Sequence, residues 1–358
     1  MKKIYFEWMR IIACGLVIFN HLAGYTLYMH STGVKQAFYM TLTMITRINV
    51  PLFFMISGAL LLRKEEDFKY IIQKRTSRIL EVTFLFEVGL FILFGLKAIH
   101  HGEVYDWSIM SFLRGFFSGG ISGAGAYWYL YAYLGFLLML PFLQRIAAKM
   151  KKEDFVILFL IHFAFSSFLP LLNITLRKMG VDGISISGDF SVPLATTKAF
   201  VYPMMGYYLE NFVNLRTISK KKIATLTVAM IIGIYLSCWC TYYEGNTTGT
   251  YTQNYVQLFD YLTTIAAFIL IKYLVAEKIP QLSKGNIGKT VSKIGGLTFG
   301  IYLLDPYWKS TIYGHYYNAV TNYFPVLVVS GLWVVFSMTL GGIVTVILKK
   351  LPILRKIL

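Results

Sequence analysis

The first long apolar stretch of the chain reads Trp8-Met-Arg-Ile-Ile-Ala-Cys-Gly-Leu-Val-Ile-Phe-Asn-His-Leu-Ala-Gly-Tyr25. It contains Arg10 and His21, two residues that are costly in hydrocarbon and therefore mark a functional site in a membrane protein. Eleven steps of about 100° bring a helix back to within roughly 20° of its starting direction, and a rise of about 1.5 Å per residue separates the two by about 16 Å. We therefore expect one continuous helix with Arg10 near one membrane surface and His21 deep inside, on the same face.

The composition of the 358-residue chain is that of a membrane protein. It is 56% hydrophobic and only 14% charged, and its repeated apolar runs of about 20 residues match the thickness of a bilayer. The sequence predicts an all-α, polytopic membrane helix bundle, a single domain over residues 1–358, with about ten transmembrane helices. The predicted spans are residues 8–29, 39–62, 79–96, 127–143, 154–172, 192–210, 223–243, 257–276, 294–313 and 324–348.

The formal charge of +17 suggests nucleic acid as a partner, but the placement of the basic residues argues against this. Basic clusters lie at residues 63–78, 144–152, 272–293 and 349–356, all on one predicted side, whereas the loop 244–254 on the other side has no Lys or Arg. Lys and Arg are enriched in cytoplasmic loops. We therefore expect a multi-pass protein of the cell membrane with both termini in the cytosol, with the lipid bilayer as a partner and no nucleic acid.

The three cysteines do not suggest a metal site. Cys14, Cys238 and Cys240 have neither zinc-ligand nor redox spacing and lie within predicted spans. We interpret them as small apolar packing residues and expect no metal.

A pair of arginines enters the third predicted span. Arg75 and Arg78 lie at i and i+3, on one face of a helix. Neighbouring guanidinium groups bind phosphate oxygens bidentately, which Lys does less well. Arginines are also common in cytosolic flanks, so the pair alone is a weak signal. Its place on the same predicted side as Arg10 favours the binding of a phosphorylated cytosolic donor.

In the second predicted span, Pro51 interrupts the backbone hydrogen bonds and Ser57-Gly58 allows another helix to approach closely. By itself this pattern indicates a kinked, tightly packed helix. Two ionisable residues in later spans, His162 and Asp260, have no partner that the sequence identifies, and they stay unassigned.

Taken together, the motifs resemble the integral-membrane acyltransferase-3 family over essentially the whole chain. The similar stretches are Arg10 and His21 at R-x10-H spacing, Val50-Pro-Leu-Phe-Phe-Met-Ile-Ser-Gly58, Arg75-Thr-Ser-Arg78, Tyr127-Trp-Tyr-Leu-Tyr-Ala-Tyr-Leu134 and Thr298-Phe-Gly-Ile-Tyr-Leu-Leu304. No single motif decides the assignment, but the set and its order are specific.

The resemblance implies a membrane O-acetyltransferase that moves an acetyl group from cytosolic acetyl-CoA to a hydroxyl, usually on a cell-envelope carbohydrate or glycolipid acceptor. On that pattern His21 is the catalytic imidazole and Arg10 is its companion in the donor channel. Arg75 and Arg78 then bind the phosphates of acetyl-CoA. Imidazole titrates near neutrality, which suits a general base for the acceptor hydroxyl.

One position departs from the family pattern. Many members have His-Pro after the Phe-Gly-Ile-Tyr-Leu stretch, whereas this chain has Asp305-Pro306, which puts a role for a second histidine in doubt. Asp305 either orients an imidazole, pairs with Lys309, or is a carboxylate at the edge of a loop.

Two other classes of function stay open. Polytopic bundles with buried Arg and His also serve as transporters, which inverted repeats with paired broken helices would favour, and no convincing pair is visible. The same fold also serves as a non-catalytic uptake or interaction module. The sequence does not identify the acceptor, the acyl group or the oligomeric state.

Overall fold

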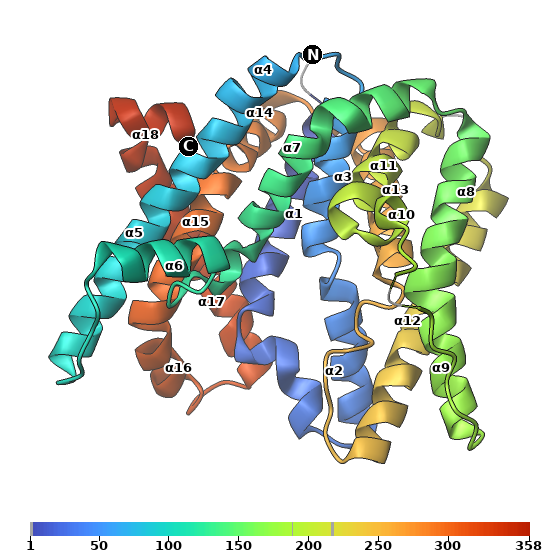
Figure 1. Ribbon diagram of the computed structural model, residues 1–358, viewed down its shortest axis with the longest axis horizontal. Coiled ribbons are helices and arrows are strands. Elements are labelled where there is room, and N and C mark those ends of the chain that lie inside the picture. Colours follow the sequence, from blue (N-terminus) through green and yellow to red (C-terminus); the bar gives the residue numbers. More distant parts are fainter. Residues whose placement is uncertain (1–2, 188, 216–217) are drawn as a thin grey trace. The chain divides into compact units, whose positions relative to one another are not determined.

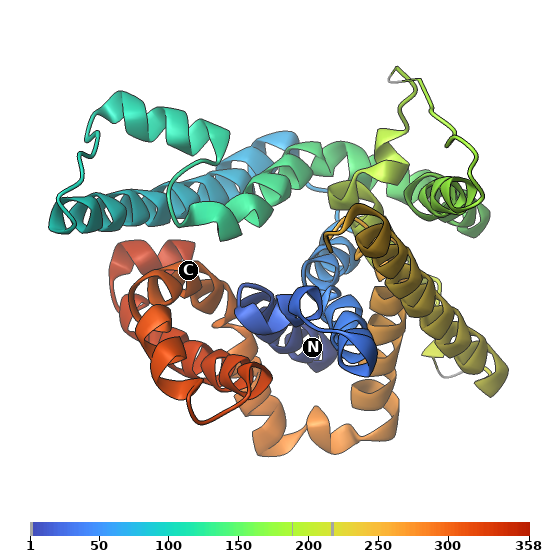
Figure 2. The ribbon, with the colours of Figure 1, turned by 90° about the horizontal axis from the view of Figure 1, so that it is seen from below.

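The described part of the chain is helical throughout. The computed structural model describes residues 3–187, 189–215 and 218–358, and every regular element in these ranges is a helix. The helices form two compact units: unit 1 comprises residues 1–65 and 142–295, and unit 2 comprises residues 66–141 and 296–358. Figures 1 and 2 show the helices from two directions. The predicted all-α fold class is confirmed.

The two units divide the elements as follows. Unit 1 contains α1 (Ile4–Asn20), η1 (Ala23–His30), α2 (Gly33–Thr46), α3 (Asn49–Leu61), α8 (Lys152–Phe163), η4 (Ala164–Phe168), α9 (Leu169–Lys178), α10 (Pro193–Thr196), α11 (Lys198–Asn211), α12 (Lys220–Thr248), α13 (Asp260–Tyr273), η6 (Leu274–Lys278), η7 (Pro280–Leu282) and α14 (Gly285–Gly295). Unit 2 contains α4 (Phe68–Tyr70), η2 (Ile71–Thr76), α5 (Ser77–His100), α6 (Ile109–Ser118), η3 (Ala124–Tyr127), α15 (Thr298–Trp308), η8 (Lys309–Tyr313), α16 (Gly314–Val320), α17 (Val326–Leu348) and α18 (Pro352–Ile357). Helix α7 (Trp128–Lys149) contributes its residues to Pro141 to unit 2 and the remainder to unit 1.

Within the described residues, six helical segments are long and apolar enough to cross a membrane, and the bent pair α1 and η1 adds a seventh if it forms one span. The six are Gly33–Leu61, Phe68–His100, Ala124–Lys149, Lys152–Lys178, Lys220–Thr248 and Val326–Leu348. A multi-pass membrane protein is therefore confirmed. The count of ten spans and the cytosolic side of both termini stay predictions.

Three of the predicted spans are not among the six. Helix α11, in the predicted span 192–210, has only 14 residues. Helix α13 has Lys272 in its last turn and continues directly into η6, which contains Glu277 and ends at Lys278. Helix α15 has 11 residues but continues without a break through η8 and α16 to Val320. The segments that begin with α13 and α15 are therefore long enough to cross a membrane, and their composition separates them from the six.

The core of unit 1 contains a very close crossing of α3 and α11. A Cβ atom added at Gly58 would collide with the backbone carbonyl of Pro203, and one added at Gly206 would collide with the carbonyl of Met55. Small residues let membrane helices approach until their backbones touch. The close approach that Ser57-Gly58 predicts is therefore confirmed, and its partner is Gly206.

Unit 2 is organised by tyrosine hydroxyls that donate to backbone carbonyls of neighbouring helices. The Tyr127 hydroxyl donates to the carbonyl of Leu303, and the Tyr302 hydroxyl donates to the carbonyl of Ala126 over 2.5 Å. These reciprocal bonds join η3 to α15. Helix α6 folds back toward α5 (Figure 2). Phe84 on α5 and Phe112 on α6 meet edge to face with ring centroids 5.3 Å apart.

Candidate functional site

His21 lies where the first helix ends. It is the C-cap residue of α1, its backbone N–H donates to the Ile18 carbonyl over 3.1 Å, and η1 begins at Ala23 after a bend of 52°. The expectation of one continuous helix over residues 8–29 is therefore wrong: the helix breaks at His21. Asn20, which precedes His21, is a weak helix former because its polar side chain competes for backbone groups. The half-buried imidazole thus lies beside the open end of a helix within an apolar segment.

Arg10 lies about three turns earlier on α1, and it is held by a partner that the sequence analysis did not identify. Its Nη1 atom lies 2.6 Å from Oε1 of Glu7, three residues before it, and the Glu7 side chain is only 2% exposed. On α14, Gly295 packs directly on Glu7, where a Cβ atom would collide with the carboxylate. Removing one partner of such a buried pair leaves an uncompensated charge. Glu7 therefore fixes the direction of the Arg10 guanidinium.

Arg75 and Arg78 belong to unit 2, and the structure gives their guanidinium groups different partners. Arg75, in the π-helical turn η2, forms two bonds with Glu66, from Nε to Oε2 at 2.7 Å and from Nη2 to Oε1 at 2.5 Å. Arg78, exposed on the first turn of α5, donates from Nε to the Ile357 carbonyl over 2.9 Å. A phosphate that binds Arg75 must compete with the Glu66 carboxylate.

A further cation lies close to Arg78. Lys349 follows the last residue of α17 and donates to the Gly296 carbonyl over 3.0 Å. Burial lowers the pKa of Lys349, and the charge of Arg78 lowers that pKa further. Arg78 and Lys349 therefore form a local excess of positive charge.

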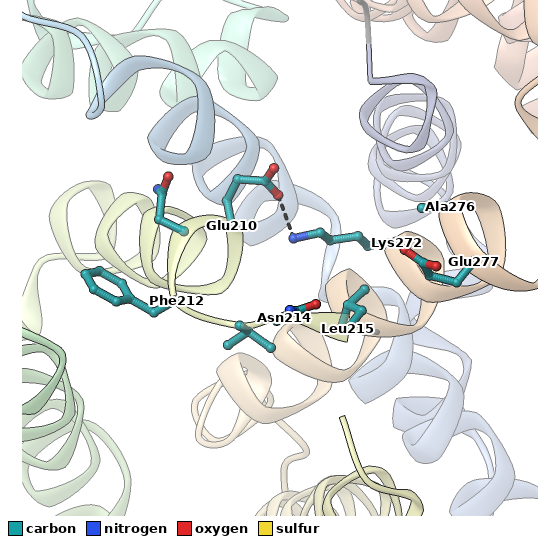
Figure 3. Close-up of a pocket in the computed structure, with 9 residues that line it drawn as sticks. Glu210, Phe212, Asn214, Leu215, Lys272, Ala276 and Glu277 are labelled. Atoms are coloured by element: carbon teal, nitrogen blue, oxygen red, sulfur yellow. Dashed lines mark ion pairs between the residues drawn. The ribbon is translucent and has the colours of Figure 1, made fainter. Parts of the chain in front are cut away.

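At the end of unit 1 that includes the start of α1, three helices share one carboxylate. Glu210 near the end of α11 accepts bonds from Lys3 and from the Tyr5 hydroxyl, the latter over 2.7 Å, and lies 2.9 Å from Nζ of Lys272 on α13. A cavity of about 320 Å³ opens here. It is lined by residues 210–215 together with Lys272, Ala276 and Glu277, and Figure 3 shows the Glu210–Lys272 ion pair at its edge.

The family comparison covers nearly the whole chain. The model of the acyltransferase-3 family, described as an acyltransferase domain, matches residues 3–348. The chain belongs to the acyltransferase-3 family. Neither the curated proteins nor the solved structures yield a significant match. The match includes the segments that contain Arg10, His21, Arg75 and Arg78.

In this acyltransferase, Arg47 is a further candidate site residue, which the sequence analysis did not identify. It lies between α2 and α3, near the middle of the apolar segment Gly33–Leu61, and its guanidinium carbon is 5.7 Å from the centroid of the Tyr25 ring. Asn20, the neighbour of His21, donates to the carbonyl of Thr46, the neighbour of Arg47, over 3.3 Å. The rule that singled out Arg10 and His21, an ionisable residue within a span, applies equally to Arg47.

The structure also brings together Asp260 and His162, which the sequence left unassigned. Asp260, 4% exposed, accepts a bond of 2.5 Å from the Tyr202 hydroxyl and lies 3.1 Å from Nζ of Lys198. The buried ring of His162 meets Tyr202 edge to face at 6.2 Å, and its Nδ1 atom lies 2.8 Å from the Ala195 carbonyl oxygen. Tyr202 on α11 therefore links the two residues.

Two buried carboxyl groups of the acyltransferase lie in unit 2. Asp305 lies inside α15 and accepts a bond of 2.9 Å from Ser337 on α17. It is thus not the loop-edge carboxylate that Pro306 suggested, because Pro306 also lies within the helix. Glu87 accepts a bond of 2.9 Å from the Tyr131 hydroxyl. Across the described ranges, no group of three or more His, Cys, Asp or Glu side chains is arranged to hold a metal ion.

Proposed function

We propose that this protein transfers an acetyl group from acetyl-CoA to a hydroxyl of a cell-envelope sugar or glycolipid, with His21 as the general base. The observation that carries the proposal is the place of His21 in a member of an acyltransferase family: it caps a broken helix within an apolar segment. An imidazole there is half-buried at the end of a helix, where partial exclusion of water would strengthen its interactions with the substrate.

The reaction is a simple acyl transfer. The imidazole of His21 removes the proton of the acceptor hydroxyl while the hydroxyl oxygen attacks the thioester carbonyl carbon. The tetrahedral intermediate then collapses, the bond from carbon to sulfur breaks, and the imidazolium returns the proton to the departing thiolate. The products are the O-acetyl ester and free coenzyme A, and the imidazole is restored.

The arginines have separate roles in this proposal. Arg75 and Arg78 bind the phosphates of coenzyme A, and Arg75 exchanges Glu66 for a phosphate when the donor arrives. Phosphates favour guanidinium groups because two parallel N–H bonds fit their oxygens. Arg10, directed by Glu7, is the companion of His21 in binding the donor. The donor is a charged, water-soluble molecule of the cytosol, so this assignment also requires the predicted orientation.

A comparison of cells that carry the gene with cells that lack it tests the proposed activity and identifies the acceptor in the same experiment. Mass spectrometry of envelope polysaccharides, glycolipids and small metabolites should reveal one component that loses an acetyl mass in the deletion strain. Expression of the wild-type gene should restore that mass, and expression of His21→Ala should not. Unchanged acetylation of every component in the deletion strain would remove the proposed activity.

A further inference from the structure

Among the described residues of unit 1, Arg47 has no anionic partner. It forms no ion pair in the ranges 3–187, 189–215 and 218–358, and its guanidinium lies over the ring of Tyr25 and beside the Tyr25 hydroxyl. A guanidinium within a membrane-crossing segment is normally paired with a carboxylate or with backbone carbonyls. A half-buried, unpaired guanidinium at this depth is a group prepared for a ligand.

Two buried neutral polar atoms lie near Arg47. The Oδ1 atom of Asn20 has no hydrogen-bond partner among the residues that the structure describes, and the Oη atom of Tyr25 lies beside the Arg47 guanidinium. Buried polar atoms are nearly always hydrogen bonded in folded proteins, so each such exception calls for an explanation. Together with Arg47 they supply a charged donor, a hydroxyl and an acceptor.

Asn20 and Tyr25 lie close in the chain to the residue proposed as the base. Asn20 precedes His21 directly, and its amide reaches the carbonyl of Thr46 next to Arg47. Tyr25 follows on η1 across the bend, and its ring lies under the Arg47 guanidinium. The break of α1 and the break between α2 and α3 are therefore joined, with His21 and Arg47 on either side of the joining bond.

The other charged groups in this region leave an excess of positive charge. The carboxylate of Asp260 is already engaged by Tyr202 and by Lys198, and Lys198 also donates to Gln257. Among the described residues Asp260 pairs with Lys198 and not with Arg47, so the charge of Arg47 has no counterion there. A ligand that carries a negative charge would balance the charge of Arg47.

We propose that Arg47, Tyr25 and Asn20 form an acceptor subsite that binds an anionic oxygen group, a carboxylate or a phosphate, of the sugar to be acetylated. The inference rests on the proposed function, since it assigns the acceptor of the same reaction. Arg47 binds two oxygens of the anion bidentately. The Tyr25 hydroxyl donates to the same group, and Asn20 Oδ1 accepts from a sugar hydroxyl, which holds a second hydroxyl toward His21.

Sugar pairs that differ in one group test the subsite in the purified, detergent-solubilised protein. Methyl β-D-glucuronide and methyl β-D-glucoside differ only by a carboxylate at the sixth carbon, and methyl glucoside 6-phosphate supplies the phosphate. One of the two anionic sugars should raise the melting temperature of the wild-type protein at a concentration at least ~10-fold lower than the glucoside requires. This is the difference expected for hydrogen bonds to a charged group. The anionic sugar that acts at the lower concentration shows whether the subsite binds a carboxylate or a phosphate.

Substitutions of Arg47 show whether its guanidinium binds a ligand or only stabilises the fold. Arg47→Gln should reduce the preference for the anionic sugar to about onefold while the weak response to the glucoside stays, and Arg47→Lys should retain part of the preference. Because an unpaired charge within the membrane disfavours folding, Arg47→Met without ligand should melt at the same temperature as the wild type or higher. Lys35→Met, at an exposed position of α2, is the matched control.

Three results would overturn the subsite: equal stabilisation by charged and uncharged sugars, a preference that survives Arg47→Gln, or a clear fall in the melting temperature of Arg47→Met, which would show that the guanidinium holds the fold together. Acetyl transfer is measured separately with labelled acetyl-CoA. A preference that depends on Arg47 without any acetyl transfer would leave the anion site standing and remove the proposed function.

Discussion

The side-chain amide of Asn20 donates to the backbone carbonyl of Thr46 over 3.3 Å, and this bond joins two interruptions in the helices of unit 1. On one side of it His21 ends α1, and on the other Arg47 separates α2 from α3. Backbone groups freed by a break inside a membrane need new partners. Asn20 provides one of them and at the same time fixes the distance between the proposed base and the unpaired guanidinium.

Replacing Asn20 should affect activity more than stability. Asn20→Ala removes one hydrogen bond, worth about 1 kcal/mol in folding free energy, but it also releases the position of His21 relative to α2. We expect a small fall in melting temperature and a fall of at least ~10-fold in the turnover number of acetyl transfer, since small misplacements of a catalytic group are costly. Thr41→Ala, which removes a hydrogen bond to Ala37 on α2, is the control. Equal losses of activity in both variants would contradict this role of Asn20.

The ion pair between Arg75 and Glu66 gives opposite predictions for its two members. Arg75→Ala should raise the Michaelis constant for acetyl-CoA by roughly 10- to 100-fold, the value of a charged hydrogen bond to phosphate. Glu66→Gln should lower that constant or leave it unchanged, because the carboxylate competes with the donor for the guanidinium. Lys74→Ala, one residue away and exposed, measures the effect of general positive charge. A Michaelis constant that rises in Glu66→Gln as much as in Arg75→Ala would show that the pair is structural.

The crossing of α3 and α11 should not tolerate a methyl group. Gly58→Ala and Gly206→Ala each place a Cβ atom against a backbone carbonyl, and overpacking of this kind costs about 1–3 kcal/mol. Gly135 on α7 has no atom within 4 Å of an added Cβ, so Gly135→Ala should stabilise the protein slightly through the better helix propensity of Ala. Melting temperatures in detergent decide the comparison. If Gly58→Ala and Gly206→Ala are as stable as Gly135→Ala, the close crossing is absent from the protein in its membrane.

The predicted orientation is open to a labelling experiment. In a background without Cys14, Cys238 and Cys240, a single cysteine at Thr248, near the end of α12, should react with a membrane-impermeant maleimide added outside intact cells. A single cysteine at Lys152, at the start of α8, should react only after the cells are opened. The reverse pattern would place the termini outside the cell and would separate Arg75 and Arg78 from cytosolic acetyl-CoA.

Local patterns predicted the all-α fold, the membrane class and the close packing at Gly58, because hydropathy and residue size act within one helix. The break at His21 was not predicted. The apolar run continues through Tyr25, and no local signal in it marks the end of the helix at His21, where the side chain of Asn20 forms a hydrogen bond to Thr46 on another helix. Three of the ten predicted spans are also not among the six: α11 is too short, and the longer helical segments that begin with α13 and α15 are not apolar enough.

The candidate site shows the same division between local and tertiary information. Glu7 lies one turn before Arg10 and was visible in the sequence, as was Arg47 in the middle of an apolar segment. The pairing of Arg75 with Glu66, and the link from Asp260 to His162 through Tyr202, join residues that no spacing rule relates. Those relationships required the packed helices.

The turnover of purified His21→Ala with acetyl-CoA and the acceptor tests the central claim most directly. General-base help is worth about 10²- to 10⁴-fold, so the variant should lose at least ~100-fold in turnover while it inserts, purifies and melts like the wild type. His30→Ala, an exposed histidine at the end of η1, should keep its activity. Near wild-type turnover by His21→Ala would show that the catalytic base lies elsewhere.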